Sequence, residues 1–225
     1  MGGVSVNQLS DSAQNYLKII YGLGEWSTAP VTATEIAAKA GMKLSTVSGA
    51  LAKLRSQGLL DHAPYGAVQL TDTGRSYAVA MVRRHRLIET FLVDMLGYRW
   101  DQVHDEAEQL EHAVSDFLIE RIDQLLEHPV KDPHGDPIPT AEGTVALPAA
   151  VNLGKLAEDA SVVVERISDD DSQLLQYFQE HQLVVGARLQ VALGDPYSQT
   201  LEVQAEHGPL LRLGPAAASA VWVSR

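Results

Sequence analysis

The chain has 225 residues, no cysteine, an apolar fraction of 45% and a formal net charge of −12 at pH 7. No apolar run approaches the roughly 18 residues of a membrane span, and no basic segment followed by an apolar stretch opens the chain as a secretory signal would. The absence of cysteine excludes disulfide bonds and thiolate metal ligands. These features lead us to expect a cytoplasmic protein with no membrane partner.

The negative charge is distributed unevenly along the chain. Residues 1–75 carry six Lys and Arg residues against five Asp and Glu residues. Residues 76–130 carry five against eleven, and residues 131–225 carry six against thirteen. The first third can therefore face nucleic-acid phosphates, whereas the acidic middle of the chain favours cations.

The first third has the pattern of three short helices. Ser10 or Asp11 caps the first helix, and the capping-box pattern at residues 32–35 opens the second. The third helix is expected over residues 45–55. Two short helices around a tight turn that contains Gly41 predict a helix-turn-helix motif.

A β-hairpin is predicted directly after these helices. Two short apolar strands within residues 59–71 flank the turn sequence Ala63-Pro64-Tyr65-Gly66. A helix-turn-helix followed by such a hairpin is a winged helix, so we expect residues 1–75 to form a winged helix-turn-helix DNA-binding domain. A winged helix that contacts only protein is the alternative.

In such domains the start of the third helix enters the major groove of DNA. The candidate contact residues there are small, hydroxylated or basic: Lys43, Ser45, Thr46, Ser48 and Gly49, with Lys53 further along the helix. Hydroxyls can bind phosphate or a base edge, whereas lysines mostly meet phosphate. Because no Gln, Asn or Arg stands at the helix tip, we expect DNA shape and thymine methyl groups to provide much of the specificity.

Two longer helices are predicted in the middle third. The first begins at residues 72–75 and ends at Gly97-Tyr98, and the second is expected to run unbroken from Val103 to Leu126. Together they expose more apolar surface than the winged helix can cover. A second copy of the chain would cover it, and a twofold dimer would place two recognition helices about 34 Å apart, one turn of DNA.

These two helices carry six side chains able to bind a metal: His85, Glu89, His104, Glu108, Glu111 and His112. The last four share one face of the predicted second helix, since successive residues are rotated by about 100°. His85 and Glu89 are i,i+4 neighbours. Imidazole with carboxylate and no thiolate suits a divalent metal of intermediate to hard character.

The cluster also has other interpretations. One is that these side chains are ordinary charges on the surface of a helix. A di-iron carboxylate site needs Glu-x-x-His, whereas Glu108 and His112 are four residues apart. A zincin protease needs a His-Glu-x-x-His run, which the chain lacks. A metal-dependent hydrolase has no visible nucleophile–base pair, so the chain is not expected to be an enzyme. A regulator that senses an organic ligand without metal is a further alternative.

The last third is predicted to hold a linker and a small β domain. Residues 131–155 contain many of the prolines and little periodicity, so we expect a linker there, with His134 as a surface or turn residue. Five short strands between residues 162 and 223, interrupted by a helix at residues 172–181, predict an SH3-like barrel. The expected domains are therefore 1–75, 76–130, the linker 131–155, and 156–225, in a fold that is mainly α with β.

Several motifs occur in a fixed order along the chain. They are Tyr16-Leu17-x-x-Ile20-Tyr21, Thr71-x-x-Gly74, Arg84-His85-Arg86-Leu87-x-Glu89, Val103-His104-Asp105-Glu106-Ala107, Glu111-His112, and the run from Asp132 to Pro139. In this order they closely resemble the diphtheria-toxin-repressor family of metal-dependent transcriptional regulators. The resemblance covers the first 140 residues in sequence and the remainder in architecture, including an SH3-like (FeoA-like) C-terminal domain.

The resemblance implies a dimeric repressor that binds operator DNA when loaded with divalent metal. An ancillary site is implied at His85, Glu89 and His104, with further ligands from the C-terminal domain. Asp171 is the favoured residue there, although it can equally cap the helix that begins at Ser172. A primary site is implied at Glu108, Glu111, His112 and Asn15 of the first helix.

Members of this family that respond to iron carry sulfur ligands at the positions of Asn15 and Glu108, and those that respond to manganese carry carboxylates. Glu108 therefore points to Mn²⁺, and Fe²⁺ is the alternative. Asn15 departs from both patterns, so Asp11, one helical turn earlier, can take its place. Manganese binds most weakly in the divalent series, so a hard, oxygen-rich site has to select it by geometry rather than by affinity.

Overall fold

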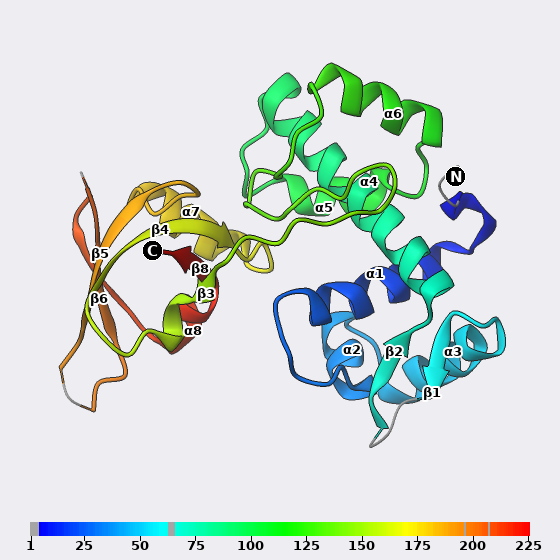
Figure 1. The fold of residues 1–225 in the computed structure, drawn as a ribbon, viewed down its shortest axis with the longest axis horizontal. Helices are drawn as coiled ribbons and strands as arrows, with labels where there is room; N and C mark the ends of the chain where they lie inside the picture. The colour runs from blue at the N-terminus through cyan, green and yellow to red at the C-terminus, as the bar shows by residue number, and fades with distance from the viewer. Residues whose placement is uncertain (1–4, 63–65, 196, 207) are drawn as a thin grey trace. The chain divides into compact units, whose positions relative to one another are not determined.

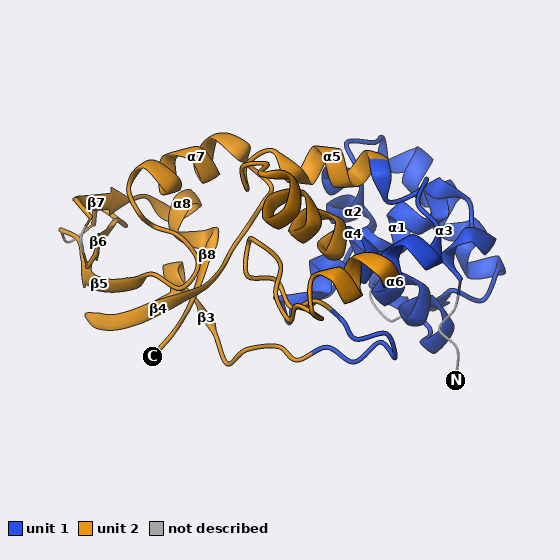
Figure 2. Cartoon of the chain, turned by 90° about the horizontal axis from the view of Figure 1, so that it is seen from above, with its two compact units in different colours: residues 1–85, 110–120, 139–145 blue, residues 86–109, 121–138, 146–225 orange. Residues whose placement is uncertain are grey.

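The computed structural model describes residues 5–62, 66–195, 197–206 and 208–225 (Figure 1). The chain divides into two compact units (Figure 2). Unit 1 contains residues 1–85, 110–120 and 139–145, and unit 2 contains residues 86–109, 121–138 and 146–225. The division falls inside one long helix, which therefore contributes residues to both units.

The first part of unit 1 is the predicted winged helix. Its elements are η1 (Val6–Gln8), α1 (Asp11–Glu25), α2 (Ala33–Lys39), α3 (Leu44–Ser56), β1 (Leu60–His62) and β2 (Val68–Leu70). The two strands pair antiparallel, which confirms the hairpin. Residues 63–65 of its predicted turn lie outside the described residues.

Local sequence signals explain where these helices begin and pack. The predicted capping box is present: the Thr32 hydroxyl accepts from the Glu35 N–H, and the Glu35 carboxylate accepts from the Thr32 N–H. Leu17, Ile36 and Val47, one from each helix, are fully buried in the core of unit 1. Burial of these apolar side chains is what holds three short helices together.

The long helix α4 (Asp72–Leu96) follows, as predicted. Its first turn packs so closely on the residue before β1 that a Cβ at Gly74 would lie 2.0 Å from the Leu59 carbonyl oxygen. Only glycine fits there. Gly97, with φ +71°, ends the helix in the left-handed conformation that glycine adopts without strain.

The helix predicted over residues 103–126 is wrong as a single element. The structure has α5 (Val103–Leu110) and α6 (Asp116–Leu125), with a turn at residues 111–115 between them. The Arg84 guanidinium donates to the carbonyl oxygens of Glu111 and Val114, at 3.0 and 3.1 Å, and it also pairs with Asp116. Because the Arg84 side chain bonds these carbonyl oxygens, the helix can end here without leaving them unsatisfied.

Unit 2 includes the C-terminal β domain. Its elements are β3 (Val151–Asn152), η3 (Leu153–Lys155), β4 (Ala160–Ile167), α7 (Ser172–Glu180), β5 (Arg188–Leu193), β6 (Leu201–Ala205), β7 (Leu210–Leu213), α8 (Pro215–Ser219) and β8 (Val221–Ser224). The strands form one sheet in the order β3-β8-β4-β5-β6-β7, and every neighbouring pair is antiparallel. The five predicted strands and α7 are confirmed, whereas β3 and α8 were not expected.

Alternate residues of these strands and one face of α7 form a single core in unit 2. Leu175 and Phe178 of α7 pack with Val164 of β4, Val203 of β6 and Val223 of β8, all buried. Among the helices formed by the described residues, none combines the length and the apolar composition needed to cross a membrane.

Candidate metal centres

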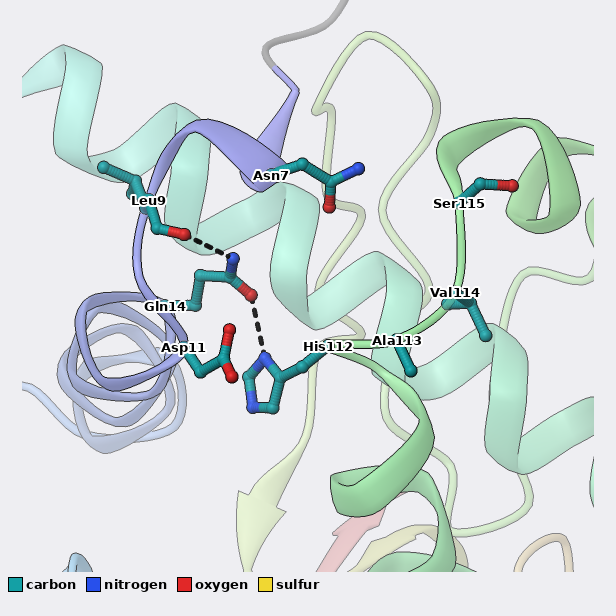
Figure 3. Close-up of a pocket in the computed structure, with 8 residues that line it drawn as sticks. All are labelled: Asn7, Leu9, Asp11, Gln14, His112, Ala113, Val114 and Ser115. Carbon is teal, nitrogen blue, oxygen red and sulfur yellow. Dashed lines mark hydrogen bonds between the residues drawn. The ribbon is translucent and has the colours of Figure 1, made fainter.

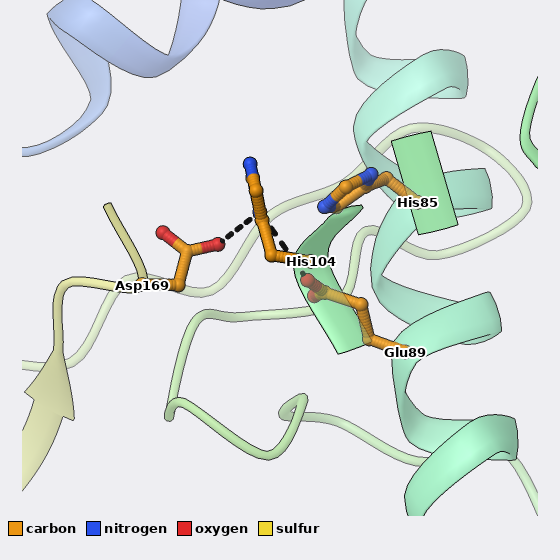
Figure 4. Close-up of side chains that lie close together, drawn as sticks. All are labelled: His85, Glu89, His104 and Asp169. Atoms are coloured by element: carbon orange, nitrogen blue, oxygen red, sulfur yellow. Dashed lines mark ion pairs between the residues drawn. The ribbon is translucent and has the colours of Figure 1, made fainter. Parts of the chain in front are cut away.

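A group of imidazoles and carboxylates lies inside unit 2. Glu89 comes from α4, His104 from α5, Asp132 and His134 from the turn after α6, and Asp169 from the segment after β4. Figure 4 shows Glu89, His104 and Asp169, with His85 one helical turn before Glu89 on α4. We call these five residues, Glu89, His104, Asp132, His134 and Asp169, the unit 2 cluster.

Glu89 is at the centre of the unit 2 cluster. It is 1% exposed, and its two carboxylate oxygens face different histidines. Oε1 lies 3.6 Å from His104 Nδ1, and Oε2 lies 3.8 Å from His134 Nδ1. Asp169 Oδ2 lies 2.7 Å from the same His104 nitrogen. Carboxylate oxygens and imidazole nitrogens thus converge around the buried Glu89, while the His104 and Asp169 side chains are 32% and 18% exposed.

His134 is oriented so that one ring nitrogen faces Glu89. Its Nε2 lies 2.8 Å from the Trp100 carbonyl oxygen, which only accepts hydrogen bonds, so Nε2 carries the proton. Its Nδ1 has no hydrogen-bond partner among the described residues and faces Glu89. Metal-binding histidines typically donate their other ring nitrogen to a carbonyl or carboxylate in this way.

The turn that carries His134 is rigidly built. One Asp132 oxygen accepts the backbone N–H groups of His134 and Asp136, both at 2.9 Å. Gly135 has φ +89°, and a Cβ there would lie 2.1 Å from the Glu165 carbonyl oxygen. From sequence, His134 was interpreted as a surface or turn residue. It does lie in a turn, but it is fully buried, so the surface interpretation is wrong.

The electrostatics of the unit 2 cluster favour a bound cation. Burial alone would lower the pKa of His104, but the carboxylates of Asp169 and Glu89 outweigh it and raise that pKa to about 11. Burial and the nearby carboxylates of Asp136 and Glu89 raise the pKa of Asp132. The group therefore holds protons that a divalent cation can replace, and its imidazole and carboxylate donors fit such a cation.

Asp171, the favoured C-terminal ligand, lies elsewhere. It is the N-cap of α7, where one carboxylate oxygen accepts from the N–H groups of Gln173 and Leu174, at 3.0 and 3.1 Å. Asp169 is the member of this acidic run that contacts His104. The sequence contained a signal for this difference, because an Asp directly before Ser172 is placed to cap the helix.

A second group lies inside unit 1 around Glu111, which is 0% exposed. His85 Nδ1 lies 2.6 Å from its Oε2, and Lys18 Nζ lies 2.6 Å from its Oε1. His112 Nε2 lies 3.5 Å from the same Oε1. Burial would raise the pKa of Glu111, but His85 and Lys18 outweigh it and lower that pKa, so the carboxylate is charged.

Gln14 of α1 determines which nitrogen of His112 is available. Its side-chain nitrogen donates to the carbonyl oxygens of Val6 and Leu9, at 2.9 and 3.0 Å, so its oxygen is left to accept from His112 Nδ1 at 2.8 Å (Figure 3). His112 Nε2 is then the lone-pair nitrogen. It is buried and has no hydrogen-bond partner among the described residues. This again is the arrangement of a metal-binding imidazole.

Leu9, Gln14 and His112 line a pocket of about 330 Å³, together with Asp11 (Figure 3). The amide oxygen of Asn15 is buried without a hydrogen-bond partner among the described residues, which is compatible with a ligand. Glu108, the remaining expected ligand of the primary site, belongs to unit 2, and its Oε1 lies 3.8 Å from His104 Nε2. Glu111 and His112 are thus brought together, but in the turn after α5 rather than on a shared helix face.

The candidate DNA-contact residues all lie along α3: five are at its N-terminal end and Lys53 is in its last turn. Lys43 is the N-cap of α3, and Ser45, Thr46, Ser48, Gly49 and Lys53 are on that helix, all exposed. The Ser48 hydroxyl donates to the Leu44 carbonyl within the helix. Met42 and Leu44, which the sequence interpretation did not single out, are 48% and 49% exposed at the same end.

A winged helix joined to helices and turns that gather buried imidazoles and carboxylates defines a class, the metal-responsive DNA-binding regulator. Three family models match the chain along its length. Residues 8–68 match "Iron dependent repressor, N-terminal DNA binding domain", residues 71–140 match "Iron dependent repressor, metal binding and dimerisation domain", and residues 151–225 match "FeoA domain".

The sequence relatives agree with these models. The chain is 34% identical to "Iron-dependent repressor IdeR" of Mycobacterium leprae over 198 residues, which is 83% of this chain and 86% of that protein. It is 35% identical to "Diphtheria toxin repressor" of Corynebacterium diphtheriae over 164 residues, 73% of this chain and 68% of that protein. The chain belongs to the diphtheria-toxin-repressor family of metal-dependent transcriptional repressors, as its motifs indicated.

Solved structures of related proteins support the same fold. A "Manganese-dependent transcriptional repressor complex with manganese" superposes with a TM-score of 0.89 at 49% identity, covering 94% of this chain and 98% of the other. The "manganese regulator SloR" superposes with a TM-score of 0.81 at 33% identity, covering 95% and 98%. The expected fold class, a winged helix followed by a helical domain and an SH3-like FeoA domain, is confirmed. Members of the family are repressors and not enzymes.

Proposed function

We propose that the protein is a repressor activated by Mn²⁺, which binds double-stranded operator DNA as a homodimer in the cytoplasm and controls metal-ion homeostasis. The observation that carries the choice of metal is the chemistry of the buried donors. The unit 2 cluster and the group around Glu111 offer imidazole nitrogens and carboxylate oxygens. The chain has no cysteine, and none of its four methionines stands at a candidate ligand position.

Hard oxygen donors suit manganese better than they suit softer metals. Raw affinity in the divalent series is lowest for Mn²⁺, so a site responds to it by coordination number and geometry. Glu89 belongs to two candidate donor groups, one that includes His104 and Asp169 and one with Asp132 and His134, so both imidazole nitrogens and carboxylate oxygens are available to a cation. Two related proteins of known structure are a manganese-dependent transcriptional repressor in complex with manganese and the manganese regulator SloR, which supports the same choice.

Iron is the second candidate. The sequence relatives from Mycobacterium are named iron-dependent repressors, and Fe²⁺ also accepts imidazole and carboxylate ligands. Glu108 and the absence of sulfur at the candidate positions favour manganese over iron. The two metals are therefore compared directly in the experiment below.

We propose a revised set of ligands. The ancillary site consists of the unit 2 cluster, with Asp132, His134 and Asp169 added to the expected Glu89 and His104. The primary site uses Glu108, Glu111, His112 and a donor from α1, either Asn15 or Asp11. His85, one helical turn before Glu89 on α4, is retained as a proposed ancillary ligand, and its Nδ1 also contacts Glu111 at 2.6 Å.

The coupling to DNA follows from where these residues lie. Within unit 1, Gln14 and Lys18 of α1 in the winged helix contact His112 and Glu111. A bound divalent metal supplies a positive centre that ligands from separate segments can share. The winged helix is then held in one position, and operator binding tightens by the difference in metal affinity between the two states.

The DNA surface is proposed to be the exposed start of α3, extended by Lys53 in the last turn of that helix. Lys43 and Lys53 contact phosphates, and Ser45, Thr46, Ser48 and Gly49 approach the groove closely. Met42 and Leu44 are added as apolar groups able to meet thymine methyls. We also propose that the functional domains are residues 1–75, 76–130 and 156–225, with residues 131–155 as a linker.

The experiment measures binding of the protein to genomic DNA fragments at fixed salt. It is run with chelator and then with Mn²⁺, Fe²⁺, Zn²⁺ and Co²⁺ in turn, on wild type, Glu111→Gln and Glu89→Gln. Glu120→Gln, an exposed carboxylate on α6, is the matched control. We expect retention with micromolar Mn²⁺, loss with chelator, and loss in both ligand variants but not in the control.

Each alternative predicts a different result. Equal activation by Fe²⁺ and Mn²⁺ would favour the iron-responsive interpretation. Binding that chelator and Glu111→Gln both leave unchanged would overturn metal sensing and favour a regulator that needs no metal.

A further inference from the structure

The ammonium group of Lys18 lies among His85, Glu111 and His112 in unit 1, and Glu111 is a proposed metal ligand. Lys18 Nζ is 2.6 Å from Glu111 Oε1 and 3.4 Å from His85 Nδ1. The Lys18 side chain is 12% exposed and that of Glu111 is 0% exposed. The charge of this lysine is therefore largely withdrawn from water and directed at the most buried carboxylate of the group.

This contact accounts for how Glu111 stays charged without a metal. A buried carboxylate is strongly destabilising unless it is paired, and the Lys18 ammonium, with His85, provides the pairing. The oxygen that Lys18 contacts, Oε1, is also the one that lies 3.5 Å from His112 Nε2. Lys18 therefore contacts the same Glu111 oxygen that lies near the lone-pair nitrogen of His112.

We infer that Lys18 is an internal cation that occupies the Glu111 carboxylate in the metal-free protein and competes with the divalent ion for it. The inference rests on the proposed role of Glu111 as a metal ligand. Two cations a few ångströms apart in a partly buried site repel strongly, so Lys18 has to withdraw from Glu111 Oε1 when that oxygen binds a metal. Lys18 thus raises the metal concentration at which the repressor responds.

The position of Lys18 gives this competition a structural consequence. Lys18 is on α1 of the winged helix, whereas Glu111 follows α5 and His85 is on α4. Without metal, the Lys18 ammonium is therefore an ionic contact between the winged helix and these segments. A bound metal would replace this contact with coordination by Asn15 or Asp11 of α1, and this would change how α1 is held.

The test uses Lys18→Met, which keeps the aliphatic chain and removes the charge, and Lys18→Gln, which keeps a hydrogen-bond donor. Lys39→Met, an exposed lysine in the last turn of α2, is the matched control. Mn²⁺ affinity is measured by calorimetry on the full chain, and thermal unfolding is followed in chelator and in saturating Mn²⁺. The melting curves provide a readout that does not depend on DNA.

Competition predicts opposite effects on the two states. Both Lys18 variants bind Mn²⁺ more tightly, by about tenfold to a hundredfold, because a neighbouring positive charge has been removed. In chelator they melt at a lower temperature than wild type, because Glu111 has lost a partner, and the rise in Tm on adding Mn²⁺ is larger than in wild type. Lys39→Met behaves as wild type throughout.

Equal or weaker Mn²⁺ affinity in both Lys18 variants, with an unchanged rise in Tm, would overturn the inference, since Lys18 would then support the metal-bound state. Failure of the proposed function looks different. In that case Glu111→Gln binds Mn²⁺ as tightly as wild type, whatever the Lys18 variants do.

Discussion

Gln14 is 2% exposed, and it is the residue through which α1 controls the imidazole of His112. Glutamine can donate and accept at once, and both functions are used here: two backbone carbonyls take its N–H groups, and His112 Nδ1 gives its proton to the oxygen. No spacing rule identifies such a residue, because Gln14 and His112 are far apart in sequence. A buried polar side chain on an apolar helix face was the available signal.

Replacing Gln14 by Leu should lower Mn²⁺ affinity by about ten- to a hundredfold, the size of effect that outer ligand partners typically have. The reason is that His112 loses the acceptor that fixes its tautomer and ring orientation. Calorimetric titration measures the affinity, and Gln57→Leu, an exposed glutamine at the end of α3, is the control. A folded Gln14→Leu variant with wild-type affinity would contradict this role.

Asp101 shows how one carboxylate contributes to the pH dependence of stability. The Arg99 guanidinium donates to both of its oxygens, at 3.0 and 2.5 Å, and keeps the pKa of Asp101 below its usual value. A lowered carboxyl pKa adds stability above the unfolded value of about 3.9, and that stability is lost as the pH falls through the folded value.

We therefore expect Asp101→Asn to lower the urea midpoint slightly at pH 7, and the gap from wild type to close between about pH 5 and pH 3. The effect is small because Arg99 is 60% exposed, and it shrinks in high salt. Urea unfolding at pH 7, 5 and 4 measures it. A gap that widens as the pH falls would contradict the assignment.

Among the elements, the turn between α5 and α6 shapes the proposed primary site most directly. A continuous helix would have carried Glu111 and His112 along the line of α5. The turn instead leaves Glu111 fully buried against Lys18 and His85. Arg84 holds this turn from α4, since it bonds two of its carbonyls and pairs with Asp116.

Replacing Arg84 by Met should destabilise the protein by about 2–3 kcal/mol, because buried carbonyls lose their donor. It should also weaken Mn²⁺ binding, since the backbone of Glu111 is no longer held. Urea unfolding and calorimetry measure the two effects, and Arg121→Met, an exposed arginine on α6, is the control. Full stability in Arg84→Met would show that the turn forms without this side chain.

At the scale of the whole molecule, α6 presents an apolar face that its own chain leaves in solvent. Phe117, Leu118 and Leu125 are 73%, 44% and 54% exposed, while Ile119 and Ile122 are buried on the other side. Exposed apolar groups of this size on one helix face indicate an interface. The matched family model for residues 71–140 is described as a metal binding and dimerisation domain, which is consistent with this surface.

Phe117→Glu should therefore shift the protein from dimer to monomer, since a charge would be placed in the apolar contact. Sedimentation measures the oligomeric state, and operator affinity should fall in parallel because two half-sites are no longer bound together. Glu120→Gln on the same helix should remain dimeric. A Phe117→Glu protein that sediments as a dimer would move the interface to another surface.

The helices, the hairpin and the five strands could be predicted from sequence because periodicity, caps and glycines act over a few residues. The family and the residue types of the candidate metal sites followed from ordered motifs.

The break at residues 111–115, the burial of His134 and the choice of Asp169 over Asp171 could not be predicted. Each depends on a partner distant in sequence: Arg84 for the break, the Trp100 carbonyl and Glu89 for His134, and His104 for Asp169. Side chains that satisfy buried charges and carbonyls across the fold are decided only by tertiary structure, because their free energy depends on which groups packing brings together.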